Sequence, residues 1–204
     1  WVQGKRGSYM RFNALNPANS TVAVDLACQG ADFKYLDYQH NCKLVGPCNK
    51  QSIAQLLRVA LEPDDFLLLA MGSTPLLDTS DGTMTWDPDK GHYVIDVTHA
   101  DGRRQHLRVQ VRGQDWDVIE STMYTPGGKV EWKLTNKDFA NVKTESGEPW
   151  RVPDKSRFEQ PADKGDLIVD WKDRTLNLEL EDELFDFPLD MGIPTCGQGN
   201  QPTP

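Results

Sequence analysis

Six successive apolar residues set the strongest constraint on how this chain can fold. The run Phe66, Leu67, Leu68, Leu69, Ala70 and Met71 leaves no side of a helix suited to water, so it has to be covered. The stretch is about ten residues long, far too short to span a bilayer, which takes roughly twenty apolar residues. The cover is therefore either the rest of the protein or an apolar ligand.

The run belongs to a helical insertion over residues 49–77. Asn49 is suited to cap a first helix, whose apolar residues recur at helical spacing. Pro63 suits the first position of a second helix, with two aspartates in its first turn and Gly72 as its stop. We expect these two helices to form a lid.

On both sides of the lid, apolar and polar residues alternate as they do in strands with one wet face. Residues 21–28 alternate in this way, and parity selects a two-residue loop at Gly30 and Ala31 that pairs Cys28 with Phe33. The predicted fold class is mainly β (α+β): an incomplete, strongly curved antiparallel β-barrel with the helical lid over its apolar face.

Later strands follow the same alternation, and parity selects a three-residue loop through Arg103 that pairs Val97 with Leu107. We expect the strand after Phe33 to continue to about Cys42. Residues 144–164 are polar, hold three prolines and show no period, so they are predicted to form a long surface crossing. A last hairpin is expected from residues 166–171 and 174–180.

Size and charge narrow the class of protein. The 204 residues predict one domain over residues 1–195, a monomer, followed by a flexible tail over 196–204. Lys and Arg number 22 and Asp and Glu number 31, so the formal net charge of −9 disfavours nucleic acid as a partner.

The four cysteines indicate the redox state of the compartment in which the protein works. They could form two disulfides in three alternative pairings. Cys42 and Cys48 bracket five residues that a disulfide could close, which leaves Cys28 for Cys196. Because disulfides belong to oxidising compartments, this pattern predicts an exported protein. The alternative is four free thiols in a cytosolic protein.

Catalytic motifs are missing. The serines lack a GxSxG setting, and no phosphate-binding glycine motif occurs. The four histidines have no metal-binding spacing and are predicted to lie at the surface, so we expect neither a metal nor another cofactor. Carboxylate pairs such as Asp64 and Asp65 leave a secreted hydrolase as a rival hypothesis.

A family resemblance rests on the order of these elements. Strand, tight hairpin, strand, the insertion CNKQSIAQLLRVALEPDDFLLLAMGSTPLL, and a meander closing on RTLNLELEDELFDFPLDMGIP together resemble the LolA/LolB-like family of periplasmic lipoprotein carriers and outer-membrane lipoproteins. The resemblance spans roughly residues 8–195. It implies an incomplete barrel around helices, with acyl chains in the space between them.

The chain departs from that family in two places. The family has a helix and a strand before the point that corresponds to Trp1, so Trp1 is expected to fall inside the natural beginning of the domain. The apolar loop with which a LolB-type receptor inserts its cargo has no counterpart at the turn of Gly30 and Ala31.

The resulting prediction is a non-enzymatic carrier of lipid or lipoprotein acyl chains, periplasmic or anchored to the outer membrane, with a further protein partner in the envelope. The alternative is a structural or interaction lipoprotein of an outer-membrane assembly. Seven residues are predicted to wall the ligand cavity: Leu56, Leu57, Phe66, Leu69, Met71, Trp132 and Trp171.

Overall fold

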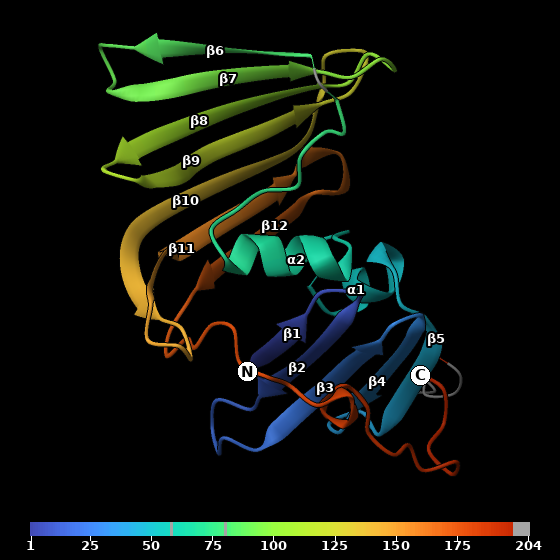
Figure 1. Ribbon diagram of the computed structural model, residues 1–204. Helices are drawn as coiled ribbons and strands as arrows, with labels where there is room; N and C mark the ends of the chain where they lie inside the picture. Colours follow the sequence, from blue (N-terminus) through green and yellow to red (C-terminus); the bar gives the residue numbers. More distant parts are fainter. Residues whose placement is uncertain (58, 80, 198–204) are drawn as a thin grey trace. The chain divides into compact units, whose positions relative to one another are not determined.

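The strands form two antiparallel sheets, one of five and one of seven strands (Figure 1). The computed structural model describes residues 1–57, 59–79 and 81–197, without the side chains of residues 55 and 56. The expected antiparallel, unclosed β architecture with few helices is confirmed. The chain divides into two compact units, and a single domain over residues 1–195 stays a prediction.

Unit 1 holds Trp1–Leu56, Ala60–Leu67 and the residues from Glu179 onward. Its five strands are neighbours in chain order, so each is joined to the next by a hairpin. Their bounds are β1 (Val2–Lys5), β2 (Tyr9–Leu15), β3 (Val22–Gln29), β4 (Asp32–Asp37) and β5 (Cys42–Pro47).

The tight turn between β3 and β4 is confirmed. Cys28 pairs with Phe33, and Gly30 has a φ of 61°, as a type II′ turn requires. The prediction that the next strand continues to Cys42 is wrong, because the chain turns after Asp37. The Asp37 carboxylate accepts hydrogen bonds from the backbone N–H groups of Gln39 and His40, which stabilises this turn locally.

Helices α1 (Lys50–Leu57) and α2 (Pro63–Ala70) lie within the predicted lid. The Asn49 side chain caps α1 by accepting from the N–H groups of residues 51 and 52. At the start of α2, the Asp64 carboxylate accepts from the N–H groups of Gly7 and Ser8 in the β1–β2 turn. The helix starts are therefore fixed by side-chain hydrogen bonds within unit 1.

The C-terminal segment, residues 180–196, returns to the five-stranded sheet. Phe187 packs with Ala27 and Leu36 of the sheet in a small apolar cluster. Arg11 donates to the carbonyl oxygen of Asp186 at 2.8 Å, while its guanidinium also pairs with the buried Asp25. Lys5 and Lys34 form further ion pairs to Asp182 and Asp186, so cations of the sheet hold an acidic segment.

Both predicted disulfide pairings are wrong. Cys42 and Cys48 stand at the two ends of β5, and six extended residues span roughly 20 Å, far beyond the reach of a disulfide. Cys48 instead donates its N–H to Ala31 beside the end of β3, where it is bonded to Cys28. Cys42 is bonded to Cys196.

The pairing of Cys42 with Cys196 follows from a contact far apart in sequence. Pro194 accepts a hydrogen bond from the N–H of Lys43, and the N–H of Cys196 donates to the Lys43 carbonyl. The end of the C-terminal segment therefore runs beside the edge of β5. This return places Cys196 4.8 Å from Cys42 between Cα atoms, across 154 residues of chain.

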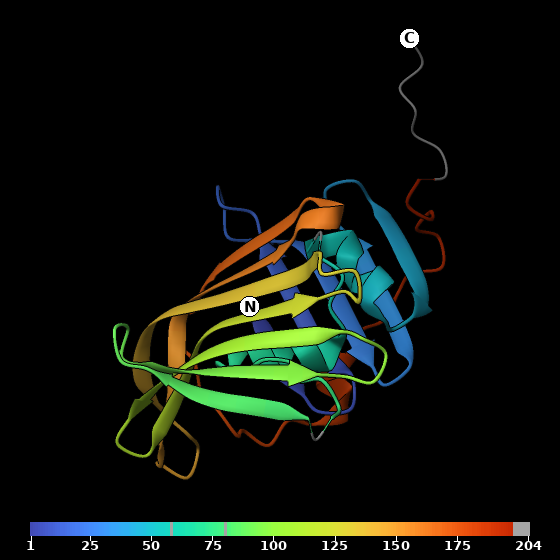
Figure 2. The same ribbon diagram turned by 90° about the horizontal axis from the view of Figure 1, so that it is seen from above.

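Unit 2 holds Leu57–Val59 and Leu68–Leu178. Its sheet has the order β12-β11-β10-β9-β8-β7-β6, again with chain neighbours side by side (Figures 1 and 2). The bounds are β6 (Gly82–Asp87), β7 (His92–Thr98), β8 (Arg104–Arg112), β9 (Asp115–Tyr124), β10 (Val130–Lys143), β11 (Pro149–Gln160) and β12 (Gly165–Asp170).

The predicted surface crossing over residues 144–164 is wrong, because most of it is β11. This strand pairs with β10 on one side and β12 on the other, and Pro149 stands at its first position. Pro153 lies within the strand beside the interruption at Asp138, whose φ is 56°. Prolines remove backbone donors, so their presence argued against a strand here. Pro149 and Pro153 are tolerated because they occur where the ladder begins or is interrupted.

Short 3₁₀ turns occupy Pro161–Asp163 and Asp182–Phe185. The expected last hairpin to residues 174–180 is also wrong, since β12 pairs with β11.

The predicted tail over 196–204 falls for the most part outside the described residues. Among the described helices, none has the length and apolar character needed to cross a membrane.

Candidate functional site

Residues 72–77, the crossing segment, follow α2 and lie across one face of the seven-stranded sheet. Gly72 lies against β11 so closely that a Cβ atom there would lie 2.4 Å from Cδ of Pro153. Thr74 donates to the Ser121 hydroxyl of β9 at 3.0 Å. The segment then reaches β8, where it meets the side chain of Gln105.

Gln105 holds the crossing segment by both ends of its amide. Its Nε2 donates to the carbonyl oxygen of Pro75 at 2.7 Å, and its Oε1 accepts from the N–H of Leu77 at 3.0 Å. Nε2 also lies 3.0 Å from the hydroxyl of Ser121. Thr74, Gln105 and Ser121 are all buried, so this network supplies hydrogen bonds that water cannot.

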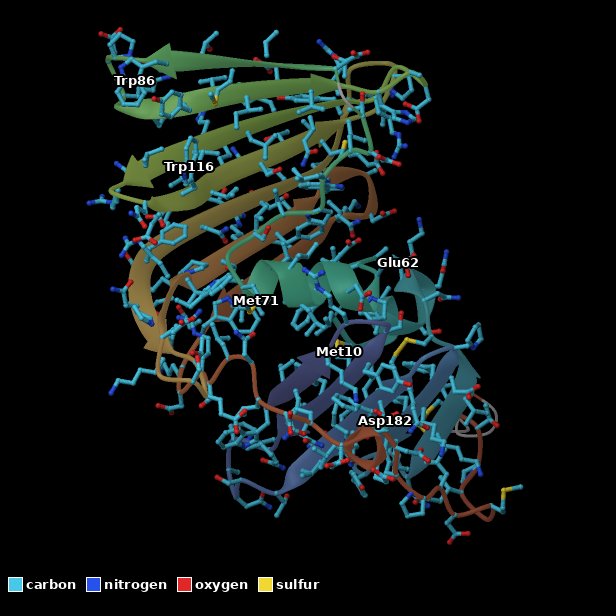
Figure 3. All side chains as sticks on the ribbon, viewed as in Figure 1. Met10, Glu62, Met71, Trp86, Trp116 and Asp182 are labelled. Carbon is cyan, nitrogen blue, oxygen red and sulfur yellow. A yellow bond between two sulfur atoms is a disulfide. The ribbon has the colours of Figure 1, made fainter. Side chains whose placement is uncertain are left out.

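The same face continues beyond the crossing segment as an open apolar patch, made of Met84, Trp86, Tyr93 and Trp116. Tyr93 contacts Trp86 with ring centroids 4.9 Å apart and stacks on Trp116 at 5.7 Å. Met84 is 56% exposed, Trp86 51% and Trp116 55%. Figure 3 shows both tryptophans at one end of the sheet. Exposed apolar side chains gathered in this way indicate an interaction site.

The two faces of the seven-stranded sheet differ in charge. From the strand register, the residues on the patch side of β6, β7 and β8 are all uncharged: Gly82, Met84, Trp86, Tyr93, Ile95, Val97, Gln105, Leu107, Val109 and Val111. The opposite face carries ion pairs, such as Glu120 between Arg108 and Lys133. Only the patch side is therefore suited to an apolar ligand.

The structure separates the seven predicted cavity residues. Trp132 is on the patch side of the sheet, opposite Met123, is 9% exposed, and stacks on Phe158 with centroids 5.6 Å apart. Trp171 donates its indole N–H to Ser156 at 3.1 Å. Both tryptophans are thus packed within unit 2.

The other five predicted residues belong to the helices and the turn after them. Leu69 is buried, while Leu57 and Met71 are half-buried, and all three belong to unit 2. Phe66 is buried and belongs to unit 1. The side chain of Leu56 lies outside the described part of the structure.

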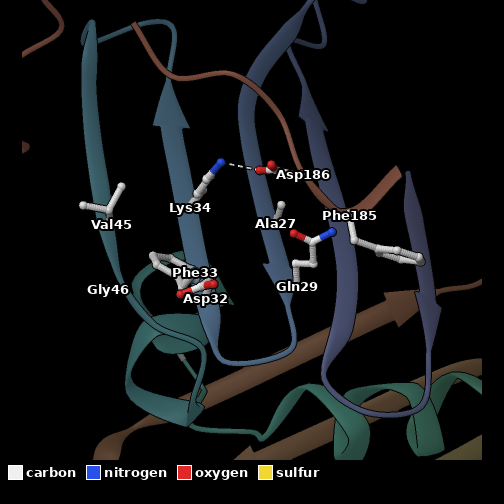
Figure 4. A pocket seen from close by; sticks show the side chains of 9 residues that line it. All are labelled: Ala27, Gln29, Asp32, Phe33, Lys34, Val45, Gly46, Phe185 and Asp186. Atoms are coloured by element: carbon white, nitrogen blue, oxygen red, sulfur yellow. Dashed lines mark hydrogen bonds and ion pairs between the residues drawn. The ribbon is translucent and has the colours of Figure 1, made fainter. Parts of the chain in front are cut away.

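Two surface hollows are present, and the larger of the two is bordered by Trp171, one of the seven predicted residues. One, of about 400 Å³, lies on the five-stranded sheet beside the C-terminal segment, where Lys34 reaches Asp186 (Figure 4). The other, of about 640 Å³, is bordered mostly by charged residues near Asp154 and Lys172. Sequence reasoning also missed Met84, Trp86 and Trp116 as surface residues. The available signal was the two-residue spacing of Met84 and Trp86, which puts both on one face of a strand.

Titratable groups offer no metal site in the described residues, where no three His, Cys, Asp or Glu side chains converge. The prediction of surface histidines is wrong for His92, which is buried on β7 between two neighbouring strands. Its Nε2 has no hydrogen-bond partner and lies 4.0 Å from the Asp87 carboxylate.

In α2, burial together with the charges of Glu62 and Asp64 raises the pKa of Asp65.

Two solved structures have a fold similar to that of this chain. A LolA superfamily protein from Nitrosomonas europaea matches 91% of this chain and 80% of its own, with a TM-score of 0.53 and 17% identity. The chain has a LolA-like fold. A DUF1329 family protein from Desulfovibrio piger matches 91% of this chain and 78% of its own, with a TM-score of 0.53 and 16% identity.

This LolA-like fold agrees with the resemblance drawn from the order of strands and helices. No family model matches the sequence, and no curated protein matches it either. At these identities the solved structures establish the fold alone.

Proposed function

We propose that this protein is an exported carrier that binds acyl chains of lipid or lipoprotein on the uncharged face of the seven-stranded sheet. The observation that carries the proposal is the open apolar patch, which continues the face beneath the crossing segment without a charged residue. The LolA-like fold supports it, and the Nitrosomonas protein is described as a member of the LolA superfamily.

The patch supplies the first contact for an acyl chain. Each buried methylene contributes about 0.8 kcal/mol, so a few methylenes on Trp86 and Trp116 already give measurable affinity. A longer chain would extend toward Trp132, beneath the crossing segment. There it would displace side chains such as Met71 and Leu69, exchanging their apolar contacts for its own methylenes.

Of the four remaining predicted wall residues, Leu57 and Trp171 enter the proposal in the same role, and Leu56 and Phe66 stay predictions from the sequence. Leu56, Leu57 and Phe66 belong to the helical region before the crossing segment, and Trp171 follows β12. Leu57 and Trp171, both half-buried in unit 2, would contact the ligand only after the crossing segment moves. Patch variants should therefore weaken binding more directly than variants of these two residues.

The two disulfides support export to an oxidising compartment. Free cysteines are absent, since all four residues are bonded. We infer a place in the bacterial cell envelope, in the periplasm or on the outer membrane. No catalytic step is proposed, because the patch side of β6, β7 and β8 carries no charged residue.

The test is displacement of a fluorescent fatty acid from delipidated protein, together with native mass spectrometry of the untreated protein. The double variant Trp86→Ala, Trp116→Ala should bind the probe about tenfold more weakly, a loss of roughly 1.4 kcal/mol from lost apolar burial. Trp150→Ala is the matched control, because Trp150 is also exposed but is outside the patch. Wild-type protein without bound or exchangeable lipid would refute the carrier.

A specific observation favours a second function, that of a structural or interaction lipoprotein in an outer-membrane assembly. Trp132 already stacks on Phe158, and Leu69 is buried by the protein itself. If these side chains are permanent core, the protein will not take up the fatty acid, and the patch will serve another protein. Probe binding that the patch variant weakens would exclude this alternative.

A further inference from the structure

In the described part of the chain, no strand pairs with the outer edge of β6. β6 is the last strand of its sheet and pairs with β7 alone. The N–H of Thr98 donates to the carbonyl of Asp81, and hydrogen-bonded positions alternate along an antiparallel pair. The backbone groups of Gly82, Met84 and Trp86 therefore point outward, away from β7, as a row of donors and acceptors.

This edge lacks the features that keep strands from pairing with other chains. Those features include charged residues, prolines, bulges and covering segments. β6 reads GTMTWD, with its one charged residue at the last position, and its register with β7 is regular. All but that last residue are exposed.

The other sheet edges in the described residues are each guarded. The edge of β5 ends at Pro47, and its Lys43 is already paired with the C-terminal segment. β12 carries the exposed Asp166 and Asp170, and β1 has only four residues and ends on Lys5. The contrast singles out β6 as a surface for strand addition.

β6 is also complementary to itself. Antiparallel pairing about a two-fold axis at Thr85 places Met84 opposite Trp86 of the second copy, with outward backbone groups of both strands facing each other. The same register places Thr83 opposite Asp87, so no like charges meet. The sulfur of Met84 would meet an aromatic ring, which is a favourable contact.

We propose that two copies of this chain associate through β6, which joins their seven-stranded sheets into one continuous sheet. This association brings Met84 of one copy beside Trp86 of the other on the patch side. It differs from the monomer expected from the sequence, and it does not depend on lipid binding. One strand pair buries less than a standard interface, so the dimer is weak and concentration-dependent.

The first test is sedimentation velocity over a concentration series of the full chain without lipid. The wild type should shift from monomer toward dimer as concentration rises. Thr85→Lys should lose that shift, because it sets two lysines opposite each other at the two-fold axis. Thr85 is exposed, so the variant should keep the melting temperature of the wild type.

Ile168→Lys is the matched control, since Ile168 is 65% exposed on the opposite edge strand. It should associate as the wild type does. A wild type that stays monomeric at every concentration overturns the proposal, as does a dimer that Thr85→Lys leaves unchanged.

Cysteine cross-linking tests the register. Thr85→Cys should form a disulfide-linked dimer under mild oxidation, because the two Thr85 positions face each other across the axis. Thr83→Cys should not, because Thr83 faces Asp87 of the second copy. Cross-linking of the Thr83→Cys variant in place of the Thr85→Cys variant would overturn the proposed pairing.

Discussion

The side-chain amide of Gln105 donates a hydrogen bond to the carbonyl oxygen of Pro75 over 2.7 Å. This bond joins β8 to the crossing segment in the middle of an apolar face. The same side chain accepts from the N–H of Leu77. One residue therefore satisfies two backbone groups of a segment that belongs to no sheet ladder.

We expect Gln105→Leu to lower the free energy of unfolding by about 2 kcal/mol, because it leaves the buried N–H of Leu77 and the partly buried carbonyl of Pro75 without their partner. Urea unfolding measures the change. Gln114→Leu, in an exposed turn, is the control and should have little effect. An unchanged stability for Gln105→Leu would show that the crossing segment does not depend on this amide.

Gly72→Ala should be much more destabilising than Gly91→Ala. Both glycines have positive φ, 74° and 65°, which costs a residue with a Cβ atom about 1 kcal/mol. At Gly91 the new Cβ meets no atom within 4 Å, whereas at Gly72 it would lie 2.4 Å from Pro153. The clash should add about 1–3 kcal/mol, measured as the difference between the two variants in urea. Equal losses would contradict the close packing of Gly72 on β11.

The disulfides should differ in what they contribute. Loop-closure entropy predicts about 3 kcal/mol for Cys28–Cys48, which closes 20 residues, and about 5 kcal/mol for Cys42–Cys196, which closes 154. These are upper values, to be compared by unfolding the two paired Cys→Ser variants. Mass spectrometry of unreduced peptides checks the pairing itself, and a Cys42–Cys48 peptide would contradict the structure.

The ion pair of Lys34 and Asp186 should make the C-terminal segment sensitive to acid. The hydrogen bond from Lys34 holds the pKa of Asp186 below its ordinary value of 3.8. A depressed acid pKa stabilises the folded state above the unfolded pKa, and that stability is lost as pH falls through the folded value. Since both side chains are partly exposed, we expect about 0.5 kcal/mol or less.

The measurement is the melting temperature of the wild type minus that of Asp186→Asn across pH. The difference should be constant at neutral pH, begin to shrink near pH 3.8 and vanish below the depressed folded pKa. Glu183→Gln, exposed on the same segment, is the control. A difference that grows as pH falls would reverse the sign and reject this role for Asp186.

Short-range patterns in the sequence determined the local elements. The turn at Gly30, the cap at Asn49, and the start and stop of α2 were all predicted and are confirmed. Each depends on the conformational preference or hydrogen bonds of residues within a few positions, so neighbouring residues suffice to specify it.

Local sequence patterns did not determine the register in which β7 pairs with β8. A three-residue loop was expected to pair Val97 with Leu107, yet Val97 pairs with Gln105. Both registers keep the apolar residues on one face, so parity cannot choose between them. The choice depends on where Gly102 adopts its φ of 89° and on the burial of Gln105 against Pro75.

Only the tertiary structure decided the contacts between distant parts of the chain. The partner of Cys42 depends on the return of residues 194–196 to β5, and the open apolar patch depends on which strands the crossing segment covers. Neither is encoded by spacing, because both arise when segments far apart in sequence compete to bury the same surface. The sequence by itself determined that an apolar face exists, and the tertiary structure decided which part of that face stays open.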